Sequence, residues 1–184
     1  MYNKHKFITV FIATIAIFFI AIISVNAQVR LTDESKVSIN GIGPIRVGMT
    51  VKEASQASGV RLIQVPSGGE EYSCLIFKPQ NEPKGINFMV TENRIARIAI
   101  WENKRISTIK GARIGDTEAR IKSLYPSQIR VTQHEYVQRG HYLTFVPKDN
   151  VDKNYRIVFE TDGNRVTNFR SGKLPEVEYI EGCA

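Results

Sequence analysis

The chain has 184 residues, of which 25 are lysine or arginine and 18 are aspartate or glutamate, giving a formal net charge of +7. Hydrophobic residues make up 42% and charged residues 23%, values typical of globular proteins, which excludes disordered and fibrous classes. Two cysteines are too few for a disulfide-dense mini-protein or a zinc site with four thiolate ligands.

The N-terminus has the three-part layout of a secretory signal. Two lysines precede an apolar run over 7–23, and small residues follow that run as far as Ala27. We predict a signal peptide over 1–27, cleaved before Gln28, and therefore a secreted or periplasmic protein. The alternative is that the apolar run, which approaches the length of a bilayer span, is kept as an anchor. No transmembrane segment is predicted after signal removal.

The rest of the sequence contains two copies of one unit, because two motifs recur in the same order about 70 residues apart. They are Arg-aliphatic-Gly-x-Thr at 46–50 and 113–117, and Ile-x-Gly at 39–41, 109–111 and 180–182. The repeats predict a polar leader over 28–38, repeat unit 1 over 39–108, and repeat unit 2 with a C-terminal strand over 109–184.

Each unit is predicted to begin with a helix and to continue as three strands. Thr50 and Glu53 form a capping box before a helix over 51–58, and Thr117 caps a second helix that ends before Pro126. The strand-like runs lie at 72–78, 85–90, 94–101, 141–146, 155–160 and 165–171. We therefore expect an α+β fold: two tandem helix-plus-three-stranded-meander units forming one curved antiparallel sheet with helices on one face.

Period-2 alternation assigns the strand residues to two faces. The face expected toward the helices carries Leu75, Phe77, Ile98, Leu143, Phe145 and Phe169. The opposite face carries Ile76, Arg97, Trp101, Tyr142, Thr144, Asn168 and Arg170, which is too polar for a core and too aromatic for an ordinary solvated surface. Because tryptophan, tyrosine and arginine are enriched at binding hot spots, Arg97, Trp101, Tyr142 and Arg170 are candidate binding residues. The alternative for Trp101 is simple packing under a loop.

The predicted export determines how the two cysteines are interpreted. In an oxidising compartment, two cysteines far apart in the sequence most simply form one disulfide, so we predict a bond between Cys74 and Cys183. The alternative is a reactive thiol, which requires an environment that lowers its pKa.

The sequence contains no recognisable catalytic constellation. His134 and His141 have no predicted nucleophile or carboxylate oriented against them, and no phosphate-binding glycine loop or zinc-protease motif is present. We therefore expect both histidines to have surface or structural roles, and we predict no enzyme activity, no metal and no cofactor.

The segment over 43–50, its second copy and the closing Glu-Gly-Cys at 181–183 resemble exported bacterial proteins of the β-lactamase-inhibitor-like (BLIP-like) fold. One unit is similar to small outer-membrane assembly lipoproteins of the SmpA/OmlA (BamE) type. The resemblance extends over 39–183. It implies binding of a protein through the concave sheet face and hairpin loops, with an acidic and an aromatic residue at one hairpin. The corresponding turn here contains Glu92 but no aromatic residue, and Glu92 joins the candidates.

These observations predict an exported non-catalytic protein-binding module, either inhibitor-like or an envelope accessory factor, that uses the exposed sheet face and hairpin loops. Its partner is an unidentified protein. The alternative is an envelope-surface binder that docks on anionic polymer or lipid through the basic segment 94–122. Nucleic acid is not an expected partner, because an exported protein does not meet it.

Overall fold

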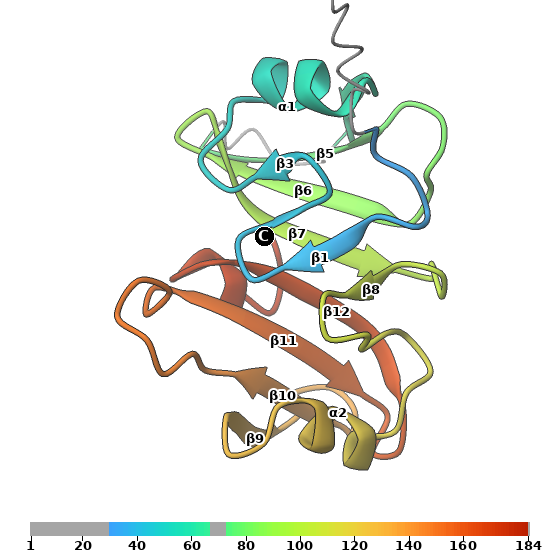
Figure 1. The fold of residues 1–184 in the computed structure, drawn as a ribbon, viewed down its shortest axis with the longest axis vertical. Helices are drawn as coiled ribbons and strands as arrows, with labels where there is room; N and C mark the ends of the chain where they lie inside the picture. Colours follow the sequence, from blue (N-terminus) through green and yellow to red (C-terminus); the bar gives the residue numbers. More distant parts are fainter. Residues whose placement is uncertain (1–29, 67–72, 184) are drawn as a thin grey trace, which may run out of the picture.

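The computed structural model describes residues 30–66 and 73–183, so the predicted signal peptide over 1–27 lies outside the described residues. Within them, 41% of residues are in strands and 12% in helices. The strands form two sheets, and two α-helices lie at opposite ends of the layer in front of the larger sheet (Figure 1). None of the described helices is long and apolar enough to cross a membrane.

The larger sheet takes four described strands from each half of the chain. The first half supplies β4 (Leu62–Gln64), β5 (Cys74–Pro79), β6 (Ile86–Thr91) and β7 (Arg94–Trp101). The second half supplies β9 (Ile129–Gln133), β10 (His141–Phe145), β11 (Tyr155–Thr161) and β12 (Val166–Lys173). The spatial order is β4-β5-β6-β7-β12-β11-β10-β9, with every neighbouring pair antiparallel. The two halves therefore meet along β7 and β12.

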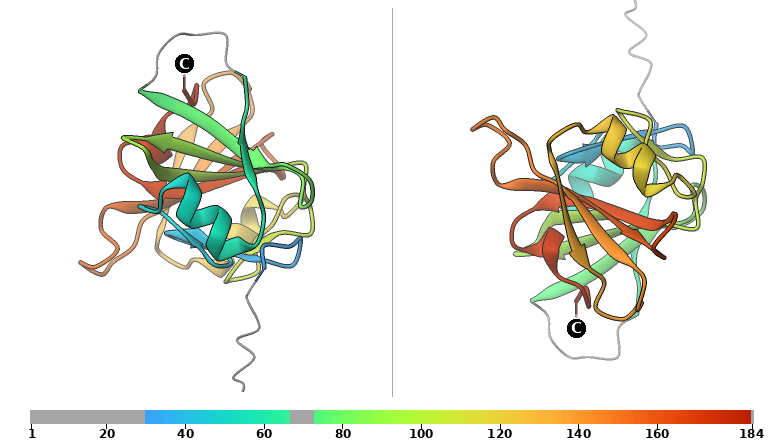
Figure 2. Two further views of the ribbon diagram at one scale, coloured as in Figure 1. Left: turned by 90° about the horizontal axis from the view of Figure 1, so that it is seen from above. Right: turned by 90° about the horizontal axis from the view of Figure 1, so that it is seen from below.

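A smaller sheet connects the start of the described chain to the segment between the two halves. Its strands are β1 (Lys36–Ser38), β2 (Gly41–Ile42), β3 (Ile45–Arg46) and β8 (Ser107–Thr108). They lie in the order β3-β2-β1-β8, and β1 pairs with β8 in parallel. This sheet and the two helices, α1 (Val51–Ser58) and α2 (Glu118–Leu124), cover one face of the larger sheet (Figures 1 and 2).

The helix boundaries follow from local capping. At α1 the Thr50 hydroxyl accepts a hydrogen bond from the Glu53 amide at 3.2 Å, and the Glu53 carboxylate accepts one from the Thr50 amide at 2.8 Å. This confirms the predicted capping box. Gly59 ends the helix in the left-handed conformation, with φ of 62°. The second helix begins at the cap residue Thr117, as predicted.

The main hydrophobic core lies between the larger sheet and this covering layer. The alternation assigned core residues correctly: Ile98, Leu143 and Phe169 are completely buried. Leu75, Phe77 and Phe145 are partly buried and pack against the same core.

The predicted fold class is wrong. The described chain is mostly β, with an eight-stranded sheet and a separate mixed sheet, and is not two helix-plus-three-stranded-meander units. The prediction missed β4 and β9, which follow the helices directly. It also missed the smaller sheet, because strands of two or three residues are too short to show a period and the pairing of β1 with β8 joins segments far apart in the sequence.

The other face of the larger sheet is crossed by residues 174–183, which we call the C-terminal strap. It contains a short 3-10 helix, η1 (Glu176–Glu178), and otherwise irregular chain. The C-terminal end lies on the opposite side of the sheet from α1 and α2 (Figure 2). The face that alternation predicted to be exposed is therefore partly covered by the chain itself.

Candidate functional site

Two buried arginines of the sheet hold the main chain of the strap. Arg97 of β7 donates hydrogen bonds to the carbonyl oxygens of Glu176 at 3.3 Å and Tyr179 at 2.7 Å. Arg170 of β12 donates from Nε to the carbonyl oxygen of Val177 at 2.7 Å. The Val177 side chain is completely buried in a small second cluster against the sheet. The sheet thus recognises backbone carbonyls of the strap as well as one apolar side chain.

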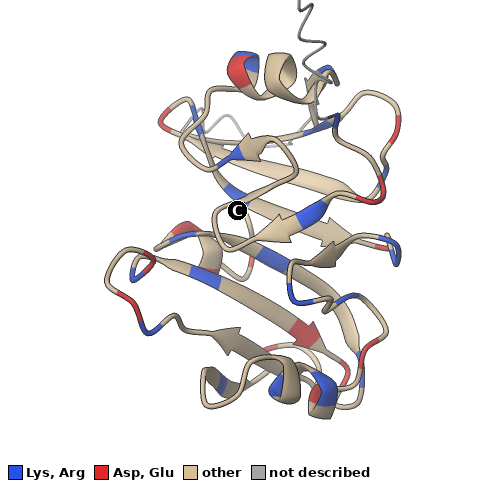
Figure 3. Ribbon diagram, viewed as in Figure 1, with Lys and Arg blue, Asp and Glu red and all other residues tan. Residues whose placement is uncertain are grey.

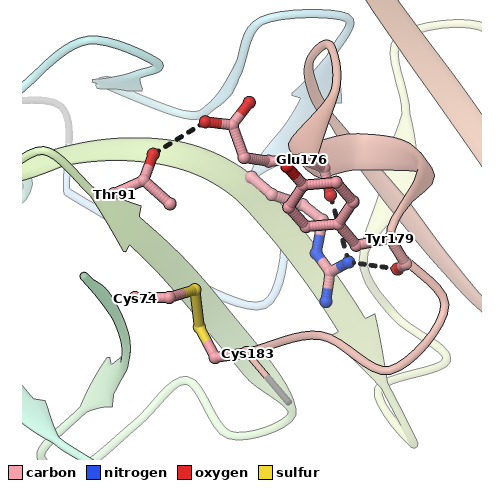
Figure 4. Close-up of a disulfide and its surroundings, with 6 residues drawn as sticks. Cys74, Thr91, Glu176, Tyr179 and Cys183 are labelled. Atoms are coloured by element: carbon pink, nitrogen blue, oxygen red, sulfur yellow. Dashed lines mark hydrogen bonds between the residues drawn. A yellow bond between two sulfur atoms is a disulfide. The ribbon is translucent and has the colours of Figure 1, made fainter. Parts of the chain in front are cut away.

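Side-chain contacts and a disulfide fix the two ends of the strap (Figure 4). The Glu176 carboxylate accepts a hydrogen bond from the Thr91 hydroxyl at 2.8 Å and lies 3.3 Å from the Lys173 ammonium. At the other end Cys183 is bonded to Cys74 of β5, with the two Cα atoms 5.4 Å apart. The predicted disulfide is confirmed.

Most charged groups beneath the strap have local partners, although Arg97 Nε and Glu176 Oε2 are buried without a hydrogen-bond partner in the described chain. Burial, and next the like charge of Arg170, lower the pKa of Arg97 from its usual value to about 10, so Arg97 stays protonated at neutral pH. Arg170 forms an ion pair with Glu160, which also accepts a hydrogen bond from Asn168 at 2.9 Å. A buried cation without such acceptors would be strongly destabilising.

The structure separates the five predicted binding residues. Arg97, Arg170 and Tyr142 come together, each less than a tenth exposed, and the Arg170 guanidinium lies 5.8 Å from the centre of the Tyr142 ring. Trp101 is 43% exposed at the end of β7, in a hollow that it shares with charged residues of the loop that follows it. Glu92 occupies the exposed turn between β6 and β7, with φ of 51°.

Two adjoining hollows lie beside the strap. The strap groove, of about 760 Å³, is lined by Ser73, Cys74, Thr91, Glu135, Tyr136, Glu178, Tyr179, Ile180, Glu181, Gly182 and Cys183. The sheet pocket, of about 210 Å³, is lined by Arg130, Thr132, Tyr142, Thr144, Val158, Arg170, Glu178 and Ile180. Glu178 and Ile180 line both hollows, so the two lie next to each other at these residues of the strap.

The strap groove combines exposed apolar surface with negative charge. Tyr136 is 67% exposed, Tyr179 44% and Ile180 43%. Among the described residues that line the groove, every charged one is a glutamate. Sequence reasoning missed this groove, because it expected the C-terminal residues to form a connector or the last strand of the second unit. The sequence Glu-Tyr-Ile-Glu at 178–181, in which glutamates flank two large apolar side chains, was the available signal.

His134 organises the loop that presents Tyr136. Its Nδ1 accepts hydrogen bonds from the backbone amides of Tyr136 at 3.1 Å and Val137 at 3.2 Å. Its ring stacks on Tyr142, with ring centres 4.4 Å apart. Its Nε2 lies 3.6 Å from the Glu160 carboxylate, so a carboxylate that the sequence did not predict does lie beside this ring.

His141 also has a structural contact, a 2.8 Å hydrogen bond from Nδ1 to Glu118 of α2. Burial raises the pKa of Glu118, but hydrogen bonds from Thr161 and His141 outweigh burial and leave the pKa below its usual value. Across the described ranges, no three histidine, cysteine, aspartate or glutamate side chains are grouped to hold a metal ion.

Several charged side chains of the basic segment 94–122 are buried or paired with carboxylates. Arg97 is buried, whereas Arg105, Arg120 and Lys122 form ion pairs with Asp33, Asp116 and Glu118, respectively. Lysine and arginine positions are spread over both halves of the fold (Figure 3). Nearby carboxylates thus partly neutralise the charge that suggested an anionic partner.

Comparison with known proteins gives little guidance. No family model and no curated protein matches the chain. One solved structure, that of the uncharacterized protein YfeY from Escherichia coli, is similar at 13% sequence identity and a TM-score of 0.49, covering 75% of this chain and 99% of that one.

Proposed function

We propose that this chain is an exported, non-catalytic protein-binding module whose strap groove holds an extended segment of its partner. The observation that carries the proposal is the joint exposure of Tyr136, Tyr179 and Ile180 in one groove. Tyrosine is enriched at binding hot spots because it covers a large area and keeps a polar group.

The charge of the groove selects the chemistry of the partner. Glu135 and Glu181 line the groove together with the exposed tyrosines, and Glu178, which pairs with Arg130, lines it as well. A complementary segment carries lysine or arginine interspersed with aliphatic or aromatic side chains, because like-charge contacts disfavour acidic partners. The groove is thus acidic on a protein whose overall charge is positive.

The anchoring of the strap supports the same proposal. Arg97 and Arg170 hold one part of the strap through its carbonyl oxygens, and the disulfide at Cys183 holds its end. A surface that is ordered before binding loses less conformational entropy when the partner docks. The disulfide also supports export, because such bonds persist in oxidising compartments.

A defined peptide tests the proposal. The probe is an N-acetylated, C-amidated peptide of alternating lysine with leucine or tyrosine, and fluorescence anisotropy measures its affinity. We expect Tyr136→Ala and Tyr179→Ala each to weaken binding about 30-fold, a typical hot-spot loss. Trp101→Ala, which removes a similarly exposed aromatic side chain elsewhere, is the matched control and should bind like the wild type.

Two further probes distinguish a basic protein segment from the alternative partner, an anionic polymer or lipid. Replacing lysine by glutamate in the peptide should abolish binding, and equal affinity for both peptides would contradict the proposal. Vesicles containing anionic lipid test the basic segment 94–122. The envelope-surface alternative would be favoured if the protein binds these vesicles in a salt-sensitive way, if both tyrosine variants retain this binding, and if the peptide does not bind.

A further inference from the structure

We infer that the sheet pocket is a binding site for a carboxylate group attached to a small apolar side chain. The pocket lies at the open part of the sheet face, beside the strap, and is formed by β9, β10, β11, β12 and the strap itself. Its lining combines two arginines, two threonines, a tyrosine and Glu178, which pairs with Arg130, with the aliphatic side chains of Val158 and Ile180.

The polar groups of the pocket that remain available are mainly hydrogen-bond donors. Arg170 uses Nε for Val177 and Nη1 for Glu160, and among the described residues its Nη2 has no hydrogen-bond acceptor. Arg130 pairs with Glu178 through Nη2 at 2.7 Å, which leaves its Nη1 and Nε without an acceptor in the described chain. Both guanidinium groups therefore have N–H groups available for a ligand.

Two hydroxyl groups complete the donor set. Thr144 is only 4% exposed and lines the pocket, yet its hydroxyl has no hydrogen-bond partner within the described chain. Thr132, which pairs with Tyr142 across β9 and β10, also has a hydroxyl without a described partner. Neither hydroxyl oxygen is fully buried, so each is accessible from the pocket and can donate a hydrogen bond to a ligand there.

The size of the pocket and its apolar wall restrict further which ligands fit. A volume of about 210 Å³ is enough for a carboxylate and a few carbon atoms. Val158 is 2% exposed and Ile180 43%, so the wall offers aliphatic contact next to the donors. The acceptors Glu160 and Glu178 already have arginine partners, so a carboxylate fits the free donors better than an amine does.

The position of the pocket suggests two sources for the carboxylate. One is a free small carboxylate, and the other is the C-terminal carboxylate of a segment lying in the strap groove, since the hollows share Glu178 and Ile180. Only this second source rests on the proposed function. Both share the same chemistry at the pocket.

Matched ligands test the pocket itself by calorimetry or NMR titration. N-acetylvaline should bind, whereas N-acetylvaline amide should bind at least tenfold more weakly, because a charged acceptor forms stronger hydrogen bonds than a neutral one. Thr144→Val and Arg130→Gln should each weaken N-acetylvaline binding about tenfold. Arg105→Gln, which removes another exposed, ion-paired arginine on a different surface, is the control and should leave binding unchanged.

The outcomes distinguish the pocket from the groove. Equal affinity for acid and amide, unchanged affinity in both pocket variants, or tighter binding of inorganic phosphate would overturn the inference. The lysine-rich probe peptide, made as the free acid and as the amide, identifies the source. If the free-acid peptide binds more tightly than the amide, and Thr144→Val removes this difference, the pocket binds the peptide C-terminus. If the two peptides bind equally while N-acetylvaline still binds, the pocket binds a free small carboxylate. Loss of peptide affinity in Tyr179→Ala with retained N-acetylvaline binding separates the two sites.

Discussion

The guanidinium of Arg97, in the middle of β7, donates a 2.7 Å hydrogen bond to the main-chain carbonyl of Tyr179, 82 residues later in the chain. This contact explains why an arginine on a central strand is 6% exposed although it lies on the face opposite the main core. The Arg97 guanidinium donates hydrogen bonds to strap carbonyl oxygens, which would otherwise be buried against the sheet without a donor.

We therefore predict that Arg97→Met loosens the strap. Methionine keeps much of the apolar length but none of the donors, and hydrogen bonds to charged groups contribute about 1.5–3 kcal/mol each. The free energy of unfolding should fall by an amount of that order, and amide hydrogen exchange should rise over 176–180. Arg94→Met is the control for exchange in the strap, because Arg94 lies exposed on the same strand and donates instead to the carbonyl oxygen of Gly48. Unchanged exchange in the strap of Arg97→Met would contradict this role.

The disulfide should be a major source of stability. The bond between Cys74 and Cys183 closes a loop with a sequence separation of 109 residues, and chain-entropy arithmetic for such a loop gives about 4–5 kcal/mol. The double variant Cys74→Ser and Cys183→Ser should lose stability of this order in urea unfolding. Its effect should match that of a reductant on the wild type, and titratable thiol in the unfolded, unreduced wild type would refute the bond.

Acid should weaken the strap through Glu176. Burial raises the pKa of Glu176, but hydrogen bonds from its own backbone amide, Thr91 and Lys173 outweigh burial and lower the pKa below 4.5. A carboxyl with a lowered folded-state pKa stabilises the fold fully above the unfolded-state pKa, and this stabilisation is lost as pH falls through the folded-state pKa. Unfolding free energy should therefore decline below pH 4.5.

The variant Glu176→Gln should remove part of this acid dependence, whereas Glu181→Gln, exposed on the same strap, should keep it. Urea unfolding at a series of pH values from neutral to acidic measures the difference. Identical acid dependence in the wild type and Glu176→Gln would assign the decline to other carboxylates.

Much of the local structure was predictable, because capping and alternation act over a few residues. Thr50, Glu53 and Thr117 marked the helix starts, and the alternation around Ile98 and Phe169 identified the core face. The disulfide followed from the cysteine count and the expected compartment. These signals depend on neighbours in sequence and not on the overall arrangement.

The strap and its two hollows were not predictable in the same way. Alternation placed Arg97, Tyr142 and Arg170 on the correct face but did not reveal that the chain returns over them, because the strap is irregular and has no period. Its contacts with β7 and β12 join residues far apart in the sequence. Composition alone does not distinguish an arginine that binds a partner from one that binds the chain's own carbonyl oxygens.

The final prediction concerns His134, which accepts hydrogen bonds from the amides of Tyr136 and Val137 and stacks on Tyr142. Phenylalanine preserves the stacking but accepts no hydrogen bond, so His134→Phe leaves those amides without their acceptor and should increase amide exchange at Tyr136. Affinity for the lysine-rich peptide should fall about fivefold, because the loss of loop ordering should cost roughly 1 kcal/mol of binding free energy. Affinity for N-acetylvaline should change little. His141→Phe, which removes a histidine bonded to Glu118 instead, is the control for the loss of an imidazole. If His134→Phe binds the peptide like the wild type, ordering of this loop by His134 does not contribute to the strap groove.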